Sequence, residues 1–67
     1  MQITLNNRPE KLPKEGMTIS DILKHKNYTF KMVVVKINGQ LIKKNNYNEA
    51  TVHDGDDVQI LHMISGG

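Results

Sequence analysis

The chain opens with apolar and polar residues in alternation, the period-two pattern of a β-strand that buries one face. This pattern predicts a strand over residues 1–5. The pair Asn6-Asn7 follows, and asparagine tolerates the left-handed backbone angles that a tight turn requires. We expect a short second strand over residues 10–12 to complete a hairpin. Pro9 places that strand at a sheet edge, because proline has no N–H to donate to a neighbouring strand.

The spacing of apolar residues then changes from two to the three and four of a helix. The apolar positions that follow this spacing are Ile19, Ile22 and Leu23. Thr18 is expected to be the N-cap, with Asp21 three residues later in the capping position. The basic residues 24–26 suit the negative end of the helix dipole, and Asn27 is a left-handed stop. We therefore predict one helix of about two turns.

A second hairpin and a last strand follow the helix. Residues 33–37 alternate as a strand, and Asn38-Gly39 is the strongest hairpin signal in the sequence, leading into residues 40–42. The next segment is polar and irregular, with a turn of helix expected at residues 47–50. After an Asp-Gly-Asp turn at residues 54–56, a last strand is expected over residues 57–64.

The predicted order of elements is hairpin, helix, hairpin and strand. A helix that follows a hairpin covers the apolar face of the sheet, and a right-handed crossover lets the last strand lie parallel beside the first. The sequence therefore predicts the α+β class and the β-grasp (ubiquitin-like) fold, a mixed sheet of about five strands with one main helix on one face. We expect residues 1–64 to form a single domain and residues 65–67 to form a flexible C-terminal tail.

Composition narrows the class of protein. A chain of 67 residues supports one small core, which makes a cleft-bearing enzyme improbable. The chain has no cysteine, which excludes disulfides and thiolate metal sites. The net charge of +2 comes from interleaved acidic and basic residues, and no basic cluster favours nucleic acid. No apolar run reaches the length of a bilayer span, so we expect a cytoplasmic protein without a membrane partner.

Residues with possible chemistry are dispersed or better explained as structure. The three histidines fall on separate predicted elements without metal-ligand spacing; they are His25, His53 and His62. The aspartates of residues 54–57 lack the twelve-residue ligand order of a calcium loop and are expected to form a solvated turn. The sequence has no nucleophile motif and no phosphate-binding glycine loop. We therefore expect neither a metal site nor catalysis by this chain.

The end of the chain carries the one candidate for chemistry. Two glycines after a strand can be a frayed terminus, and they can also lie extended in a channel too narrow for other residues. In the second case Ser65, Gly66 and Gly67 enter the active site of a partner. A partner that adenylates the terminal carboxylate with ATP would make Gly67 an acyl donor to a thiol, persulfide or amine.

A partner-binding patch is predicted beside this tail. If Val58 and Ile60 of the last strand point toward the helix, Leu61 and Met63 point to the open side of the sheet. Val34 joins them if its strand lies next to the last one, with Gln59 and Lys36 on the rim. Single exposed apolar residues are ordinary, but three on one face beside the tail indicate an interaction surface.

The chain resembles the ThiS family, the sulfur carriers of thiamine biosynthesis, over essentially its whole length. The matching features are Ile37-Asn38-Gly39, the basic pair Lys43-Lys44, Tyr47 with Glu49, Asp54-Gly55-Asp56 with Val58 and Ile60 after it, and the diglycine end. The first strand, second strand and helix also correspond. Two positions depart from the pattern: Ser65 stands where the family often has a third glycine, and Lys43 replaces a common proline.

This resemblance implies a carrier that is not itself an enzyme. A ThiF-type enzyme would adenylate Gly67, with ATP consumed by that partner and no cofactor bound to the carrier. Sulfur derived from a cysteine desulfurase would replace the adenylate, and the resulting thiocarboxylate would deliver sulfur to thiazole synthase.

Three other functions share some of these features. The MoaD family of molybdopterin synthesis also ends in Gly-Gly, although this chain is shorter than that family usually runs. A ubiquitin-like modifier would join its terminal glycine to lysines through an isopeptide bond. A structural adaptor with an incidental diglycine would keep its function when Gly66 and Gly67 are removed.

Overall fold

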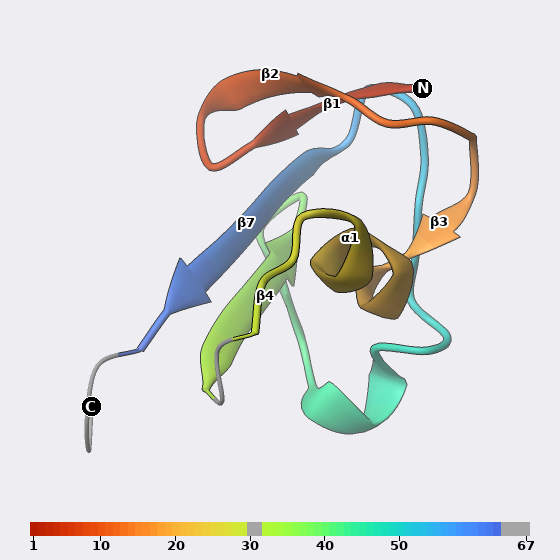
Figure 1. The fold of residues 1–67 in the computed structure, drawn as a ribbon. Coiled ribbons are helices and arrows are strands. Elements are labelled where there is room, and N and C mark those ends of the chain that lie inside the picture. Colours follow the sequence, from red (N-terminus) through yellow and green to blue (C-terminus); the bar gives the residue numbers. More distant parts are fainter. Residues whose placement is uncertain (30–31, 64–67) are drawn as a thin grey trace.

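Five strands form one mixed sheet, and a single α-helix covers one of its faces (Figure 1). The computed structural model describes residues 1–29 and 32–63. The strands occur in the spatial order β2-β1-β7-β4-β5. Their bounds are β1 (Gln2–Leu5), β2 (Arg8–Lys11), β4 (Val33–Ile37), β5 (Gln40–Ile42) and β7 (Asp57–His62). The helix α1 spans Ile19–His25. This architecture confirms the predicted α+β class and β-grasp fold.

The last strand of the chain occupies the centre of the sheet. β7 pairs with β1 in parallel, with Leu5 opposite Val58, and with β4 in antiparallel orientation along its whole length. β2 and β5 are the two edges, as Pro9 predicts for β2. The first and the last described strands, β1 and β7, are therefore neighbours in one sheet, although most of the chain lies between them.

Residues with left-handed backbone conformation form the two hairpin turns that the sequence predicts. Asn6 and Asn7, at φ of 51° and 69°, turn the chain between β1 and β2. Asn38 and Gly39, at φ of 51° and 83°, turn it between β4 and β5. Two central residues with positive φ match the right-handed twist of the flanking strands. Asparagine and glycine adopt these angles at the lowest cost among the residues.

The predicted capping of the helix is confirmed at both ends. Thr18 Oγ1 accepts a hydrogen bond from the Asp21 N–H at 3.1 Å, and Asp21 Oδ2 accepts one from the Thr18 N–H at 3.2 Å. These reciprocal bonds satisfy two donors at the helix end that have no partner within the helix. The bond from the Thr18 backbone lowers the pKa of the Asp21 carboxyl below its ordinary 3.8. At the other end, Asn27 has the left-handed φ of 57°.

The segment between β5 and β7 differs from the prediction. Its helical turn is a 3₁₀ helix, η1 (Lys44–Asn46), and lies earlier than the turn expected at residues 47–50. A two-stranded ribbon of β3 (Met17–Thr18) and β6 (Thr51–Val52) was not predicted at all. Strands of two residues show no periodicity in a sequence. The segment is placed by the start of the helix, where the Ile19 N–H donates to the Ala50 carbonyl at 3.0 Å.

Apolar side chains from both layers make one core. Its ten buried members are Ile3, Leu5, Leu12, Met17, Ile19, Ile22, Val35, Val52, Val58 and Ile60. Within the described residues, this core contains no buried polar or charged side chain. Val58 and Ile60 face α1 as their alternation predicts, which leaves the odd-numbered residues of β7 for the opposite face. In the part of the chain that the structure describes, no helix is long and apolar enough to cross a bilayer.

Removing the N-cap hydroxyl is expected to destabilise the protein through α1. Thr18→Ala deletes the acceptor for the Asp21 N–H and should lower the free energy of unfolding by about 1 kcal/mol. Urea denaturation followed by circular dichroism measures this change. Thr29→Ala is the matched control, because Thr29 is exposed and makes no side-chain hydrogen bond within residues 1–29 and 32–63. The control should stay within about 0.5 kcal/mol of the parent, and an equal loss in both variants would contradict the capping role.

The same cap makes stability depend on acid pH. Because the pKa of Asp21 is lower in the folded than in the unfolded protein, its contribution is fully present above the ordinary value of 3.8 and is lost as pH falls through the folded value. Asp21→Asn should therefore lose less stability than the parent when the pH is lowered from about 5 to about 3. Urea denaturation of both proteins at the two pH values tests this. Equal losses would show that Asp21 is not stabilised as the carboxylate.

Candidate functional site

The residues expected to carry chemistry lie at the very end of the chain. Ser65, Gly66 and Gly67 fall outside the residues that the structure describes, as does the expected flexibility of this tail. The strand that leads to them is described through its last residue, His62. The surroundings of that strand therefore define what a partner meets beside the tail.

β4 supports this last strand along its whole length. The register places Ile37 opposite Val58 at one end and Val33 opposite His62 at the other. The Met63 N–H donates to the Met32 carbonyl at 3.0 Å, which continues the pairing one residue beyond β7. The chain is thus held in an extended form up to Met63, by backbone bonds that do not depend on side-chain identity.

The predicted patch residues share the open face of the sheet. Val34 is directly opposite Leu61, and Leu61 is 46% exposed. Met63 continues the alternation of Leu61 and is partly exposed. Lys36 is opposite Gln59 on the same face, the place expected for the rim. The strand pairing therefore brings Val34, Leu61 and Met63 together next to the tail.

Two further apolar residues on this face were not predicted. Met32, opposite Met63, is 56% exposed, and Leu41, opposite Lys36, is 55% exposed. Their place beside the predicted patch could not be read from the sequence, because it depends on which residues pair across neighbouring strands. We call Met32, Val34, Leu41, Leu61 and Met63 the sheet patch. All three of the large hydrophobic residues that are exposed in the described structure belong to it.

Tyr47 ties the loop after β5 to the strand beside β7. Its hydroxyl donates to the Val33 carbonyl at 3.5 Å, at the end of β4 that faces His62. Partial burial raises the pKa of the Tyr47 phenol above its ordinary value of 10. The phenol therefore stays protonated and able to donate at neutral pH. Tyr47 has a structural role in holding β4.

The aspartates after β6 act as turn residues, as expected. Asp54 Oδ1 accepts from the Gln2 N–H at 2.7 Å, and Asp56 Oδ2 accepts from the His53 N–H at 2.8 Å. The histidines lie in the last turn of α1, in this turn and in β7. Among the described residues, no three side chains of the types that ligate metals come together.

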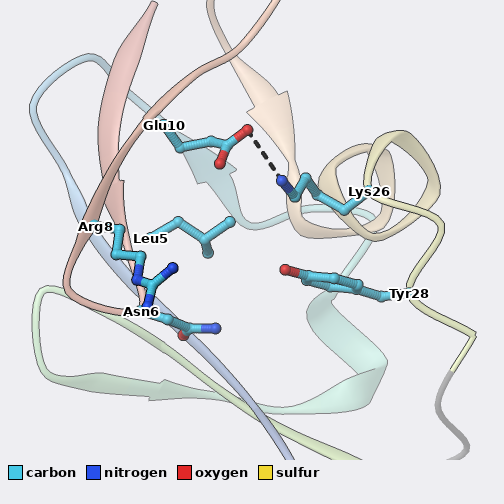
Figure 2. Close-up of a pocket in the computed structure, with 6 residues that line it drawn as sticks. All are labelled: Leu5, Asn6, Arg8, Glu10, Lys26 and Tyr28. Atoms are coloured by element: carbon cyan, nitrogen blue, oxygen red, sulfur yellow. Dashed lines mark hydrogen bonds and ion pairs between the residues drawn. The ribbon is translucent and has the colours of Figure 1, made fainter.

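A polar cavity of about 330 Å³ lies on the helix side of the sheet (Figure 2). It is lined by Leu5, Asn6, Arg8, Glu10, Lys26 and Tyr28. Across it, Lys26 Nζ and Glu10 Oε2 form an ion pair of 3.1 Å, which joins the first hairpin to the end of α1. Figure 2 shows the Tyr28 hydroxyl pointing into the same space. This cavity is on the face opposite the sheet patch and does not belong to the candidate site.

Comparisons with known proteins all lead to one family. The model of the ThiS family matches residues 3–67. The sulfur carrier protein ThiS of Bacillus subtilis (strain 168) is 34% identical over 65 residues, which cover 97% of this chain and 98% of that protein. The crystal structure of a thiamine biosynthesis protein (ThiS) from Geobacter metallireducens superposes with a TM-score of 0.88 at 28% identity, covering 100% of both chains.

A solution NMR structure of a thiamine biosynthesis protein from Geobacter metallireducens is similar as well. Its TM-score is 0.79 at 28% identity, and the match covers 100% of this chain and 88% of the other. The likeness to both structures extends over the whole chain, so it includes the β7 segment that leads to the C-terminus.

Proposed function

This chain belongs to the ThiS family of sulfur carriers of thiamine biosynthesis, and we propose that it carries sulfur as a thiocarboxylate on Gly67. The observation that supports this most directly is the diglycine end, which follows the last residue of β7, His62, by four residues in the sequence and is included in the family match over residues 3–67. Adenylation by ATP converts a terminal carboxylate into an acyl donor, and the two glycines allow this carboxylate to reach the active site of a partner.

The proposed chemistry has two steps. An oxygen of the Gly67 carboxylate attacks the α-phosphorus of ATP and displaces pyrophosphate, which leaves an acyl adenylate. A sulfur nucleophile then attacks the carbonyl carbon, and AMP departs with the shared oxygen. With hydrosulfide as the nucleophile, the product after loss of a proton is the thiocarboxylate. The two glycines allow the tail to enter a narrow channel, because neither has a Cβ.

In this proposal the catalysis belongs to partner enzymes. The chain acts as a protein cosubstrate without a bound cofactor, and ATP is consumed by a ThiF-type adenylating enzyme. The sulfur comes ultimately from a cysteine desulfurase, whose persulfide is reduced by a thiol to hydrosulfide as that thiol is oxidised to a disulfide, and thiazole synthase receives the sulfur from the carrier. We place these events in the cytoplasm, and neither nucleic acid nor a membrane has a part in them.

The sheet patch is the proposed docking surface for these enzymes. A partner that acts on Gly67 must come close to the end of β7. The open face of the sheet at that end carries Leu61, Val34 and Met63. Contiguous exposed apolar residues are typical of interaction sites, and methionine adapts to more than one partner. One surface can therefore serve the activating enzyme and the thiazole synthase in turn.

Intact mass distinguishes this function from its rivals. Incubation with ATP, a ThiF-type enzyme and sulfide should exchange one oxygen of the chain for sulfur. A ubiquitin-like modifier would instead yield high-mass conjugates in cells. A MoaD-like carrier would pass the same mass test, so transfer to thiazole synthase rather than to molybdopterin synthase decides between the two carriers.

Gly67→Ala is expected to abolish most activation without affecting the fold. An added Cβ at the terminus is expected to obstruct a narrow channel in the partner. The thermal midpoint should barely change, because the ten buried core residues all lie within residues 3–60. The rate of adenylation, followed by pyrophosphate release, should fall by about tenfold or more. A C-terminal tag should lower the rate of adenylation further, because it replaces the reacting carboxylate with a peptide bond. Adenylation of the Gly67→Ala variant at the parental rate would remove the steric argument.

Leu61→Asp or Met63→Asp is expected to weaken binding to both partner enzymes. A carboxylate on the sheet patch must be desolvated at the interface, which should cost about 1–3 kcal/mol of affinity in titration calorimetry. Loss of folding stability should be modest, because Leu61 is already half exposed.

Gln40→Asp is the matched control for these variants. It adds the same charge at an exposed position of β5, opposite Ile37 and therefore at the end of β4 far from His62. Its affinity for both partners should equal that of the parent. Unchanged affinity in the folded Leu61→Asp and Met63→Asp variants would refute the patch and leave the tail as the sole determinant.

A further inference from the structure

Asn6 makes an unusual contact with the strand that leads to the tail. Its Oδ1 accepts a hydrogen bond from the Ile60 N–H at 2.8 Å, and its Nδ2 donates one to the Ile60 carbonyl at 3.1 Å. One side chain therefore satisfies both backbone groups of a single residue in β7. This is the pair of bonds that a neighbouring strand would otherwise make.

The register of the sheet explains why Ile60 needs such a partner. The odd-numbered residues of β7 bond to the β4 side, since the Asp57 carbonyl accepts from the Asn38 N–H and the Met63 N–H donates to Met32. Backbone groups alternate in direction along a strand, so Val58 and Ile60 point toward β1. The Val58 carbonyl accepts from the Asn6 N–H at 2.9 Å.

β1 ends before it reaches Ile60. Its parallel pairing with β7 stops at Leu5 opposite Val58, and the chain turns away at Asn6 with a φ of 51°. The Asn6 side chain makes the two hydrogen bonds to the Ile60 backbone that a longer β1 would otherwise make. Asparagine suits this position, because it tolerates the left-handed turn and its amide carries both a donor and an acceptor.

We propose that Asn6 is a positioning residue, a clamp that fixes the final part of β7, the segment of the described chain that leads to the C-terminal tail. The inference rests on the proposed function, in which one partner contacts the patch and the terminal carboxylate together. β4 holds β7 on one side, and beyond Val58 the Asn6 amide holds it on the other. Without the clamp, the sheet patch still docks, but the carboxylate reaches the reacting geometry less often.

The test compares two glycine substitutions in the same turn. Asn6→Gly keeps the left-handed backbone and removes the clamp, whereas Asn7→Gly makes the same change at a φ of 69°. Asn7 is exposed and has no side-chain hydrogen bond in the described part of the chain. Asn6→Asp is a second clamp variant, which keeps the turn and the acceptor but loses the donor to the Ile60 carbonyl.

Two measurements are made at a temperature where all variants are folded. Hydrogen exchange of the Ile60 backbone N–H should be roughly tenfold faster in Asn6→Gly than in Asn7→Gly. Exchange of the Asn38 backbone N–H, which bonds to Asp57 at the other end of β7, should be the same in both variants. In ATP-dependent activation by a ThiF-type enzyme, kcat should fall roughly tenfold in Asn6→Gly with KM within about twofold of Asn7→Gly. Asn6→Asp should resemble Asn6→Gly.

The outcomes separate the clamp from a general loss of structure. Equal kcat for the two glycine variants would overturn the positioning role, and so would a rise in KM at unchanged kcat, which points to docking or folding instead. A parent that is not activated at all would remove the proposed function and the role of Asn6 with it. If the parent, Asn7→Gly and Asn6→Gly are all activated with the same kcat, the role of Asn6 is overturned and the proposed function stands.

Discussion

The parallel pairing of β1 with β7 is the constraint on which the rest of the structure depends. It joins the first strand to the last described strand at the centre of the sheet, and its short ladder has only Thr4 opposite Asp57 and Leu5 opposite Val58. The Asn6 side chain lengthens this ladder through its two hydrogen bonds to the Ile60 backbone. The Thr4 N–H also donates to the Asp56 carbonyl at 2.9 Å. Closing so long a loop costs conformational entropy, which other contacts in the fold must offset.

A core that, among the described residues, contains no buried polar or charged side chain stabilises this arrangement. The helix supplies Ile19 and Ile22, both fully buried, against Val35 and Val58 of the central strands. In so small a domain one sheet face takes nearly all of the apolar surface that can be buried. The other face remains accessible, and it is there that the sheet patch lies. The exposure of the sheet patch thus follows from having one α-helix, on the other face of the sheet, in the described part of the chain.

A carrier of this kind needs a rigid base and an accessible end. β7 can supply the rigid base, because it is the central strand of the sheet and the last strand in the described part of the chain. Pairing on both sides holds it up to Ile60, and pairing with β4 continues to Met63. In the proposed function, binding at the patch brings the terminal carboxylate to the reacting atoms at high effective concentration.

Local sequence patterns determined much of this protein. Alternation predicts the strands and their buried faces, Asn-Asn and Asn-Gly predict the turns, and Thr18 with Asp21 predicts the start of the helix. Each of these features depends on residues close together in the chain. Tertiary structure alone decided the β3–β6 ribbon, the position of η1, the places of Met32 and Leu41 in the sheet patch, and the bond from Asn6 to Ile60. These features join residues that are distant in sequence, and no local periodicity records which distant backbone groups will meet.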